Sequence, residues 1–113
     1  MNVYLDDYRP CPKGFVLARN AEECLALLRE GGIRILSLDF DLGWGQPNGA
    51  DVVYRMANER LHAQDVYLHT SSPAGRRQMF DMLAAYRPSG MTVHNGPMPE
   101  QVLKAEAGGN GPL

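Results

Sequence analysis

The sequence lacks the features that mark a secreted or membrane protein. It has only two cysteines, Cys11 and Cys24, without a CxxC pair or the histidine spacing of a zinc site, so we expect both thiols to be inert. No apolar run approaches the roughly 18 residues of a membrane helix. The acidic opening segment does not resemble a signal peptide. We therefore expect a cytoplasmic protein that does not contact a membrane.

A surplus of positive charge is also missing. Eleven basic residues face 13 acidic ones, giving a net charge of −2, whereas proteins that bind duplex nucleic acid normally present a basic surface. Duplex nucleic acid is therefore not an expected partner, but a small phosphorylated ligand or a phosphorylated RNA end is compatible with this charge. The 113 residues, 44 % of them hydrophobic, suit one compact domain with a single core.

Short apolar runs alternate with helical patterns along the chain. Helices are predicted after the capping pair Asn20 and Glu23, over 50–61, from Pro73 to residue 86, and over 99–107. This alternation predicts right-handed βαβ crossovers and a parallel sheet. The first connection is too short and too rich in proline to hold a helix. We expect one domain over residues 1–107 and a disordered tail over 108–113. The predicted strands are 3–5, 15–18, 33–38, 66–68 and 91–94.

Polar side chains follow the predicted strands directly. The carboxyl ends of parallel strands share one edge of the sheet, where ligands bind, so these side chains should converge there. Three neighbouring carboxylates, those of Asp6, Asp7 and Asp39, would repel one another unless a hard cation bound them. Mg²⁺ is the expected ion, and Mn²⁺ or Ca²⁺ would accept similar ligands. The alternative is that these acids only cap strand ends and helix starts. The residues that follow strands are Asp6, Asp7, Asp39, Asp41, His69, Thr70, Ser71 and His94.

The segment after the fourth strand suits an anion. Thr70 and Ser71 offer hydroxyl groups, and the helix that begins at Pro73 presents free amides. Arg76, one turn into that helix, offers a bidentate phosphate contact, although it could equally be a solvated surface residue. His69 could transfer a proton or be a satisfied structural residue, and His94 has weaker support for a role.

The acids Asp6, Asp7 and Asp39, with Thr70 and Ser71, stand in an order that resembles the receiver domain of two-component response regulators. This resemblance implies a flavodoxin-like α/β fold with a five-stranded parallel sheet of order 2-1-3-4-5. It also implies Mg²⁺ bound by the acids and Asp39 as the phosphate acceptor. The chain departs from receivers in lacking the first crossover helix, and it has His94-Asn95 where receivers carry a lysine.

A closer resemblance covers about residues 2 to 87, and its motifs are those of a divergent group, the cyclic-phosphate processing receiver domains. The group's name implies action on cyclic phosphates, such as 2′,3′-cyclic RNA ends or cyclic nucleotides. Phe40 and Ser72 replace a histidine and an asparagine that members usually carry. The matching motifs are Leu5-Asp6-Asp7 with Arg9-Pro10, Ser37-Leu38-Asp39 with Asp41-Leu42-Gly43, Gly49 with Asp51-Val52-Val53, and His69 with Pro73, Gly75 and Arg76.

The function expected from the sequence is metal-dependent processing or binding of a small cyclic phosphate. Two alternatives stay open. One is a signalling module in which Asp39 accepts or senses phosphate and acts through a protein partner, and the other is an interaction surface without chemistry. The expected roles are Asp39 and His69 in catalysis, Thr70, Ser71 and Arg76 in substrate binding, and Asp6, Asp7 and Asp39 as metal ligands.

Overall fold

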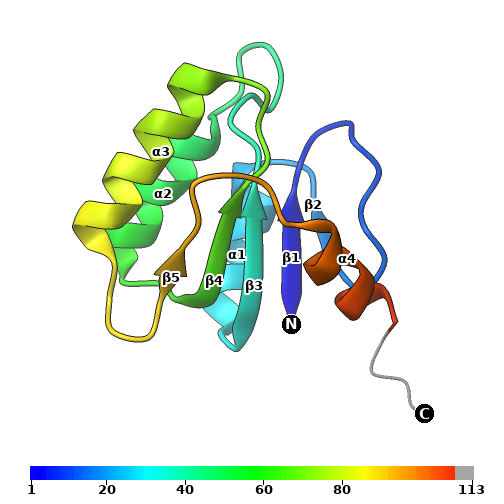
Figure 1. The fold of residues 1–113 in the computed structure, drawn as a ribbon. Helices are drawn as coiled ribbons and strands as arrows, with labels where there is room; N and C mark the ends of the chain where they lie inside the picture. The colour runs from blue at the N-terminus through cyan, green and yellow to red at the C-terminus, as the bar shows by residue number, and fades with distance from the viewer. Residues whose placement is uncertain (109–113) are drawn as a thin grey trace.

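Five parallel strands form the sheet around which the described chain, residues 1–108 of the computed structural model, is arranged (Figure 1). The strand order is β2-β1-β3-β4-β5, so the predicted receiver-like fold is confirmed. The tail expected over 108–113 lies, beyond Gly108, outside the described residues. The strands are β1 Asn2–Leu5, β2 Val16–Ala18, β3 Ile33–Leu38, β4 Ala63–Leu68 and β5 Thr92–Val93. The helices are α1 Ala21–Glu30, α2 Gly49–Glu59, α3 Pro73–Tyr86 and α4 Glu100–Ala107.

Side-chain caps start the three longer helices. Helices α1 and α3 begin at the predicted residues, and α2 begins at Gly49, one residue before the predicted start. Asn20 accepts a hydrogen bond from the amide of Glu23 at α1. At α2, Asn48 and Asp51 form a reciprocal capping box. Ser72 caps α3 at the Gly75 amide, and Pro73 takes the first helical position. Each cap satisfies amides that have no partner within the helix, so these loops end at defined residues.

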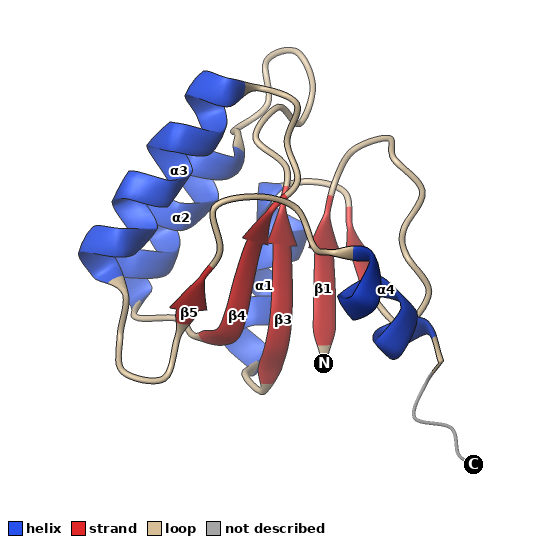
Figure 2. Ribbon diagram, viewed as in Figure 1, coloured by secondary structure: helices blue, strands red, loops and turns tan. Residues whose placement is uncertain are grey.

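The two faces of the sheet are covered unequally. Figure 2 shows α1, α2 and α3 together on one face, and α4 on the other face near β1. The side with three helices holds the main core, in which the strand residues Leu5, Leu36 and Leu68 are fully buried. The other side has a smaller cluster built on Tyr4, Ile35, Tyr67 and Met98. As predicted, residues 6–15 connect β1 to β2 without a helix.

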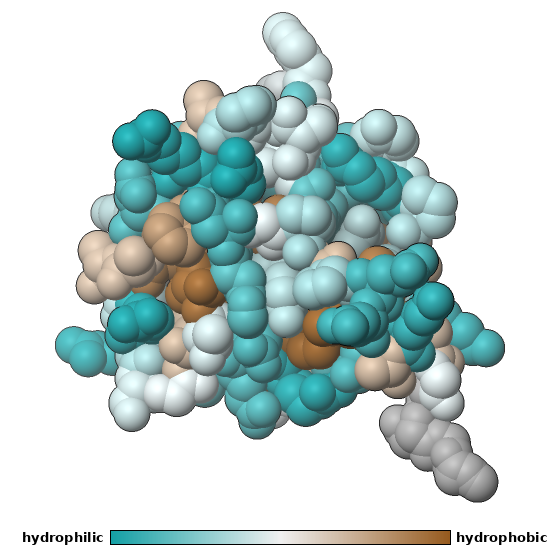
Figure 3. All heavy atoms as spheres, in the orientation of Figure 1, coloured by the Kyte–Doolittle hydropathy of each residue, from teal (hydrophilic) through white to brown (hydrophobic). Residues whose placement is uncertain are grey.

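The exterior seen in Figure 3 is mainly hydrophilic, with small hydrophobic patches between polar side chains. Within residues 1–108, no helix is long and apolar enough to cross a bilayer.

Backbone hydrogen bonds continue past the strand ends and align the residues that follow them. The Asp6 amide donates to the carbonyl of Ala18 at 3.0 Å, the Asp39 amide to Leu5 at 3.0 Å, and the His69 amide to Leu38 at 3.0 Å. The ladder therefore brings Asp6, Asp39 and His69 to one edge of the sheet. Their loops gather at that edge, at the top of Figure 2.

Helix α2 packs directly against the end of β3 through Gly49. A Cβ atom at Gly49 would lie 2.2 Å from the main-chain oxygen of Asp39 and 2.7 Å from Sδ of Met79. Gly49→Ala should therefore lower the free energy of unfolding by about 1–3 kcal/mol, measured as a lower urea midpoint. At Gly96 a Cβ would meet nothing within 4 Å, so the control Gly96→Ala should not lower the midpoint. Equal midpoints for the two variants would contradict this packing.

Candidate functional site

The carboxylate of Asp6 is fully buried at the end of β1, and both of its oxygens are hydrogen-bonded. Oδ1 accepts from the amides of Tyr8 at 2.9 Å and Arg9 at 2.8 Å. Oδ2 contacts Nη1 of Arg9 and Nε2 of His69, each at 2.9 Å. Burial alone would raise the pKa of Asp6, but the hydrogen bonds from Tyr8, Arg9 and His69 outweigh it and lower the pKa to about 2. Asp6 is therefore ionised at neutral pH.

The guanidinium of Arg9 lies between two buried carboxylates. Its Nη1 donates to Oδ2 of Asp6 and, at 3.0 Å, to Oδ2 of Asp39. Its Nη2 points toward Oγ of Ser71 at 3.4 Å. One N–H of Nη2 and the Nε N–H have no acceptor among the described residues. Arg9 thus offsets two buried negative charges and still has donors for another ligand.

His69 is enclosed on several sides. Its ring stacks on Tyr4 with centroids 4.2 Å apart, Nδ1 lies 2.7 Å from Oγ of Ser37, and the side chain is 7 % exposed. Burial lowers the pKa of His69, and the hydrogen bond to Asp6 opposes this without reversing it. The ring is therefore neutral at pH 7. A carboxylate only accepts, so Nε2 carries the proton toward Asp6, and the Ser37 hydroxyl donates to Nδ1.

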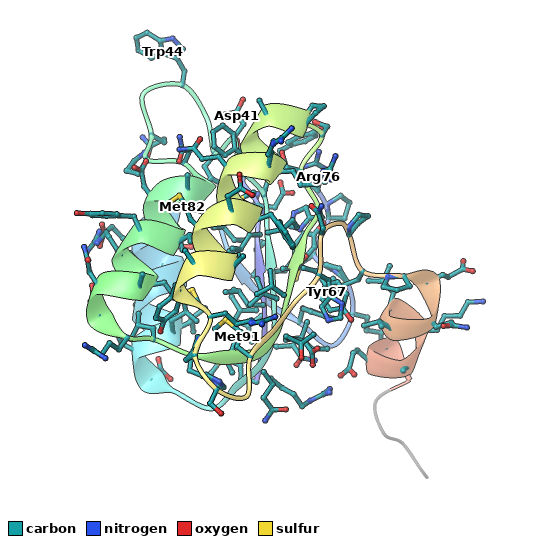
Figure 4. The ribbon with its side chains drawn as sticks, turned by 60° about the vertical axis from the view of Figure 1, so that its left-hand side comes forward. Asp41, Trp44, Tyr67, Arg76, Met82 and Met91 are labelled. Atoms are coloured by element: carbon teal, nitrogen blue, oxygen red, sulfur yellow. The ribbon has the colours of Figure 1, made fainter. Side chains whose placement is uncertain are left out.

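An open pocket of about 390 Å³ lies outside this buried network. It is formed by the loops that follow β1, β3 and β4, as expected for a parallel sheet. Asp41, labelled in Figure 4, is exposed, and its Oδ1 accepts from the Gly43 amide at 3.0 Å. The pocket is lined by Asp7, Tyr8, Arg9, Asp39, Asp41, Gly43, Trp44 and Ser71.

The structure separates the predicted site residues into two groups that meet at Asp39. Asp6, Asp39 and His69 form one cluster, in which one ligand atom from each lies within 4.8 Å of the others. Asp7, Asp39 and Ser71 line the pocket, whereas Asp6 and His69 do not.

Other predicted residues have different partners. Thr70 accepts from the amide of Ser72 at 3.1 Å, and Nη1 of Arg76 donates to Oδ1 of Asn95 at 3.1 Å. Neither Thr70 nor Arg76 lines the pocket, and Arg76 borders a separate hollow beside α3. His94 pairs with Asp65 at 2.9 Å and stacks on Tyr67.

Arg9 is the site residue to which the sequence reasoning assigned no role. Arg9 belongs to one of the family motifs, but the sequence does not show which group the side chain of a loop arginine contacts. The one available signal was its position three residues after Asp6, where the chain must turn back around a buried carboxylate.

The donor sets differ in how well they suit a divalent cation. In the cluster of Asp6, Asp39 and His69, the oxygens of Asp6 and both ring nitrogens of His69 already have partners. The carboxylate of Asp7 accepts no hydrogen bond from the described residues, and Oδ2 of Asp39 accepts only that from Arg9. Mg²⁺ binds through one or two carboxylates and keeps several waters. Asp7 and Asp39 therefore fit such an ion better than Asp6 does.

Comparison with known proteins gives a family match over most of the chain. The family model described as the cyclic-phosphate processing receiver domain matches residues 1–85. The match includes every residue that lines the pocket. No curated protein and no solved structure gives a significant match.

The lowered pKa of His69 should make stability depend on pH below neutrality. The unfolded chain binds a proton at His69 near the ordinary pKa of 6.5, whereas the folded protein binds it only at lower pH. The contribution of the neutral His69 ring to the free energy of unfolding is therefore complete above pH 6.5. This contribution is lost as the pH falls through the pKa that His69 has in the folded protein. The Tm of the wild type should fall more steeply than that of His69→Gln between about pH 7 and pH 5.

The control for this measurement is His62→Gln, at an exposed position. It should keep the slope of the wild type. A wild-type slope in His69→Gln would show that His69 is not the group that titrates.

Proposed function

The chain belongs to the family of cyclic-phosphate processing receiver domains, and we propose that it binds a small cyclic phosphate in the pocket and hydrolyses it with the help of a divalent cation. The observation that carries the proposal is the Arg9 guanidinium. It is held in place by Asp6 and Asp39, yet it lines the pocket with donors to spare. A preorganised guanidinium is well suited to the oxygens of a phosphate.

Recognition of the phosphate would use Arg9 and Ser71 together. Nη2 of Arg9 and Oγ of Ser71 are 3.4 Å apart, and both groups border the pocket. A non-bridging phosphoryl oxygen could accept from both. The buried carboxylates fix the guanidinium before the ligand arrives, so little conformational freedom is lost on binding.

The charge of the pocket supports a cation beside the phosphate. Asp7, Asp39 and Asp41 line the pocket with Arg9, so an anion alone would meet more negative than positive charge. We assign Asp7 and Asp39 as the ligands of Mg²⁺, or of Mn²⁺ or Ca²⁺, and Asp6 as the residue that positions Arg9. When bound, the ion would polarise the phosphoryl oxygen and lower the pKa of a coordinated water.

Hydrolysis also needs a proton acceptor in the pocket. A water oxygen bonds to phosphorus, one ring P–O ester bond breaks, and the departing oxygen gains a proton, so the product is a phosphate monoester with a free hydroxyl. Both ring nitrogens of His69 are engaged outside the pocket, so we assign it to holding Asp6. Asp41 is an exposed carboxylate with Oδ2 free of partners among the described residues, and we assign it as the proton acceptor.

Steady-state kinetics on a nucleoside 2′,3′-cyclic phosphate with Mg²⁺ test this proposal. Arg9→Met should reduce kcat/KM by roughly 100-fold or more, because it removes the positive group that meets the phosphoryl oxygens. Arg76→Met is the matched control and should behave as the wild type, since Arg76 contacts Asn95 instead. Circular dichroism of Arg9→Met checks that it folds, and Ser71→Ala provides a milder second variant.

Two outcomes would count against the proposal. The absence of turnover by the wild type across a panel of cyclic phosphates would contradict hydrolysis. A covalent adduct on Asp39 after incubation with a small phosphodonor would instead favour the signalling alternative.

The cation assignment is tested by thermal unfolding with and without Mg²⁺. An ion at about 100 times its Kd stabilises the protein that binds it by about 2.7 kcal/mol, so the Tm of the wild type should rise. Asp7→Asn should lose most of this rise. Asp81→Asn changes the charge equally at an exposed site on α3 and should retain it. An undiminished rise in Asp7→Asn would contradict Asp7 as a ligand.

A further inference from the structure

The loop between β3 and α2 carries an aromatic side chain that no described residue covers. Trp44 is fully exposed, at 101 %, and lines the pocket together with Arg9 and Ser71. Figure 4 shows its ring at the tip of the loop, pointing away from the body of the protein. A large apolar ring gains free energy when it leaves water. At the mouth of a polar pocket, that gain is available to a bound ligand.

The backbone around Trp44 forms a defined turn. Gly43 and Gly45 flank it with φ of +110° and +76°, which L side chains rarely adopt. The Gly43 amide donates to Asp41, and the Gly43 carbonyl accepts from the Gln46 amide at 3.2 Å. A hydrogen-bonded turn therefore places Trp44 at the tip of the loop.

The pocket as a whole has the chemistry of a nucleotide site. A second aromatic residue, Tyr8, is 74 % exposed and lines the same pocket, with the Arg9 guanidinium 5.5 Å from its ring centroid. Cationic and hydroxyl groups suited to phosphate thus lie beside aromatic rings suited to a flat base. Proteins that bind single-stranded nucleic acid combine the same two elements.

We propose that Trp44 stacks on the base of a nucleoside cyclic phosphate and is the residue that selects such ligands over cyclic phosphates without a base. This inference rests on the function proposed above and specifies its substrate class. A free nucleotide and the 3′ end of an RNA share this chemistry. Arg9 and Ser71 bind the phosphate, and Trp44 binds the base.

Tryptophan fluorescence tests the proposal directly, because Trp44 is the single tryptophan of the chain. The protein is titrated with a nucleoside 2′,3′-cyclic phosphate and, separately, with glycerol 1,2-cyclic phosphate, using free tryptophan amide to correct for absorption by the base. The nucleotide should give a saturable change in Trp44 emission. The base-free ligand should bind by calorimetry with little change in emission.

Variants separate stacking from phosphate binding. Trp44→Ala should bind the nucleotide about tenfold more weakly, as expected for loss of one stacked base, and should bind the base-free ligand as the wild type does. Trp44→Phe should recover part of the affinity. Tyr54→Ala is the matched control, since Tyr54 is a 60 % exposed aromatic residue on α2 outside the pocket.

The outcomes distinguish the two proposals. Wild-type affinity of Trp44→Ala for the nucleotide would overturn the stacking role, while Arg9-dependent binding of both ligands would leave the proposed function intact. Failure of the wild type to bind either ligand would overturn both proposals. A short RNA ending in a 2′,3′-cyclic phosphate should also bind in a Trp44-dependent way, and an affinity above that of the mononucleotide would identify RNA ends as the source.

Discussion

The burial of one carboxylate, that of Asp6, determines how the rest of the site is arranged. An ionised group without water is stable only if hydrogen bonds and opposite charge replace its hydration. Two backbone amides, the Arg9 guanidinium and the His69 imidazole provide this replacement. Meeting that need turns the chain back after β1, draws Arg9 toward Asp39 and holds the His69 ring at the carboxylate, while burial keeps that ring neutral. The pocket is the open space beside this satisfied network.

The missing crossover helix matters for the site as well as for the fold. Residues 6–15 form a loop, and the sheet face beneath them is covered by side chains from this loop and from α4, including Phe15, Val102 and Leu103. Because the loop begins at the buried Asp6, Tyr8 and Arg9 reach the pocket within three residues of it. The short connection therefore supplies both a guanidinium and an aromatic side chain to the pocket.

The residue between Asp39 and Asp41 shows how packing changes the chemistry that is available. The family resemblance of the sequence implies a histidine here, whereas this chain has Phe40. The Phe40 ring lies so close to Gly75 that a Cβ there would come within 2.3 Å of it. Phe40 therefore packs the loop after β3 against α3. Its ring has no group that could transfer a proton. For this reason, the assigned proton acceptor is a carboxylate.

The sequence by itself determined the alternating elements, the absent first helix and the meeting of Asp6 with Asp39, because residues that follow parallel strands share one edge. The strand order came from the resemblance and is confirmed. Only the tertiary structure decided which side chains face the pocket. Arg9 enters it and Arg76 turns to Asn95, since a long side chain on a loop or helix end takes its direction from charges and acceptors that distant segments supply.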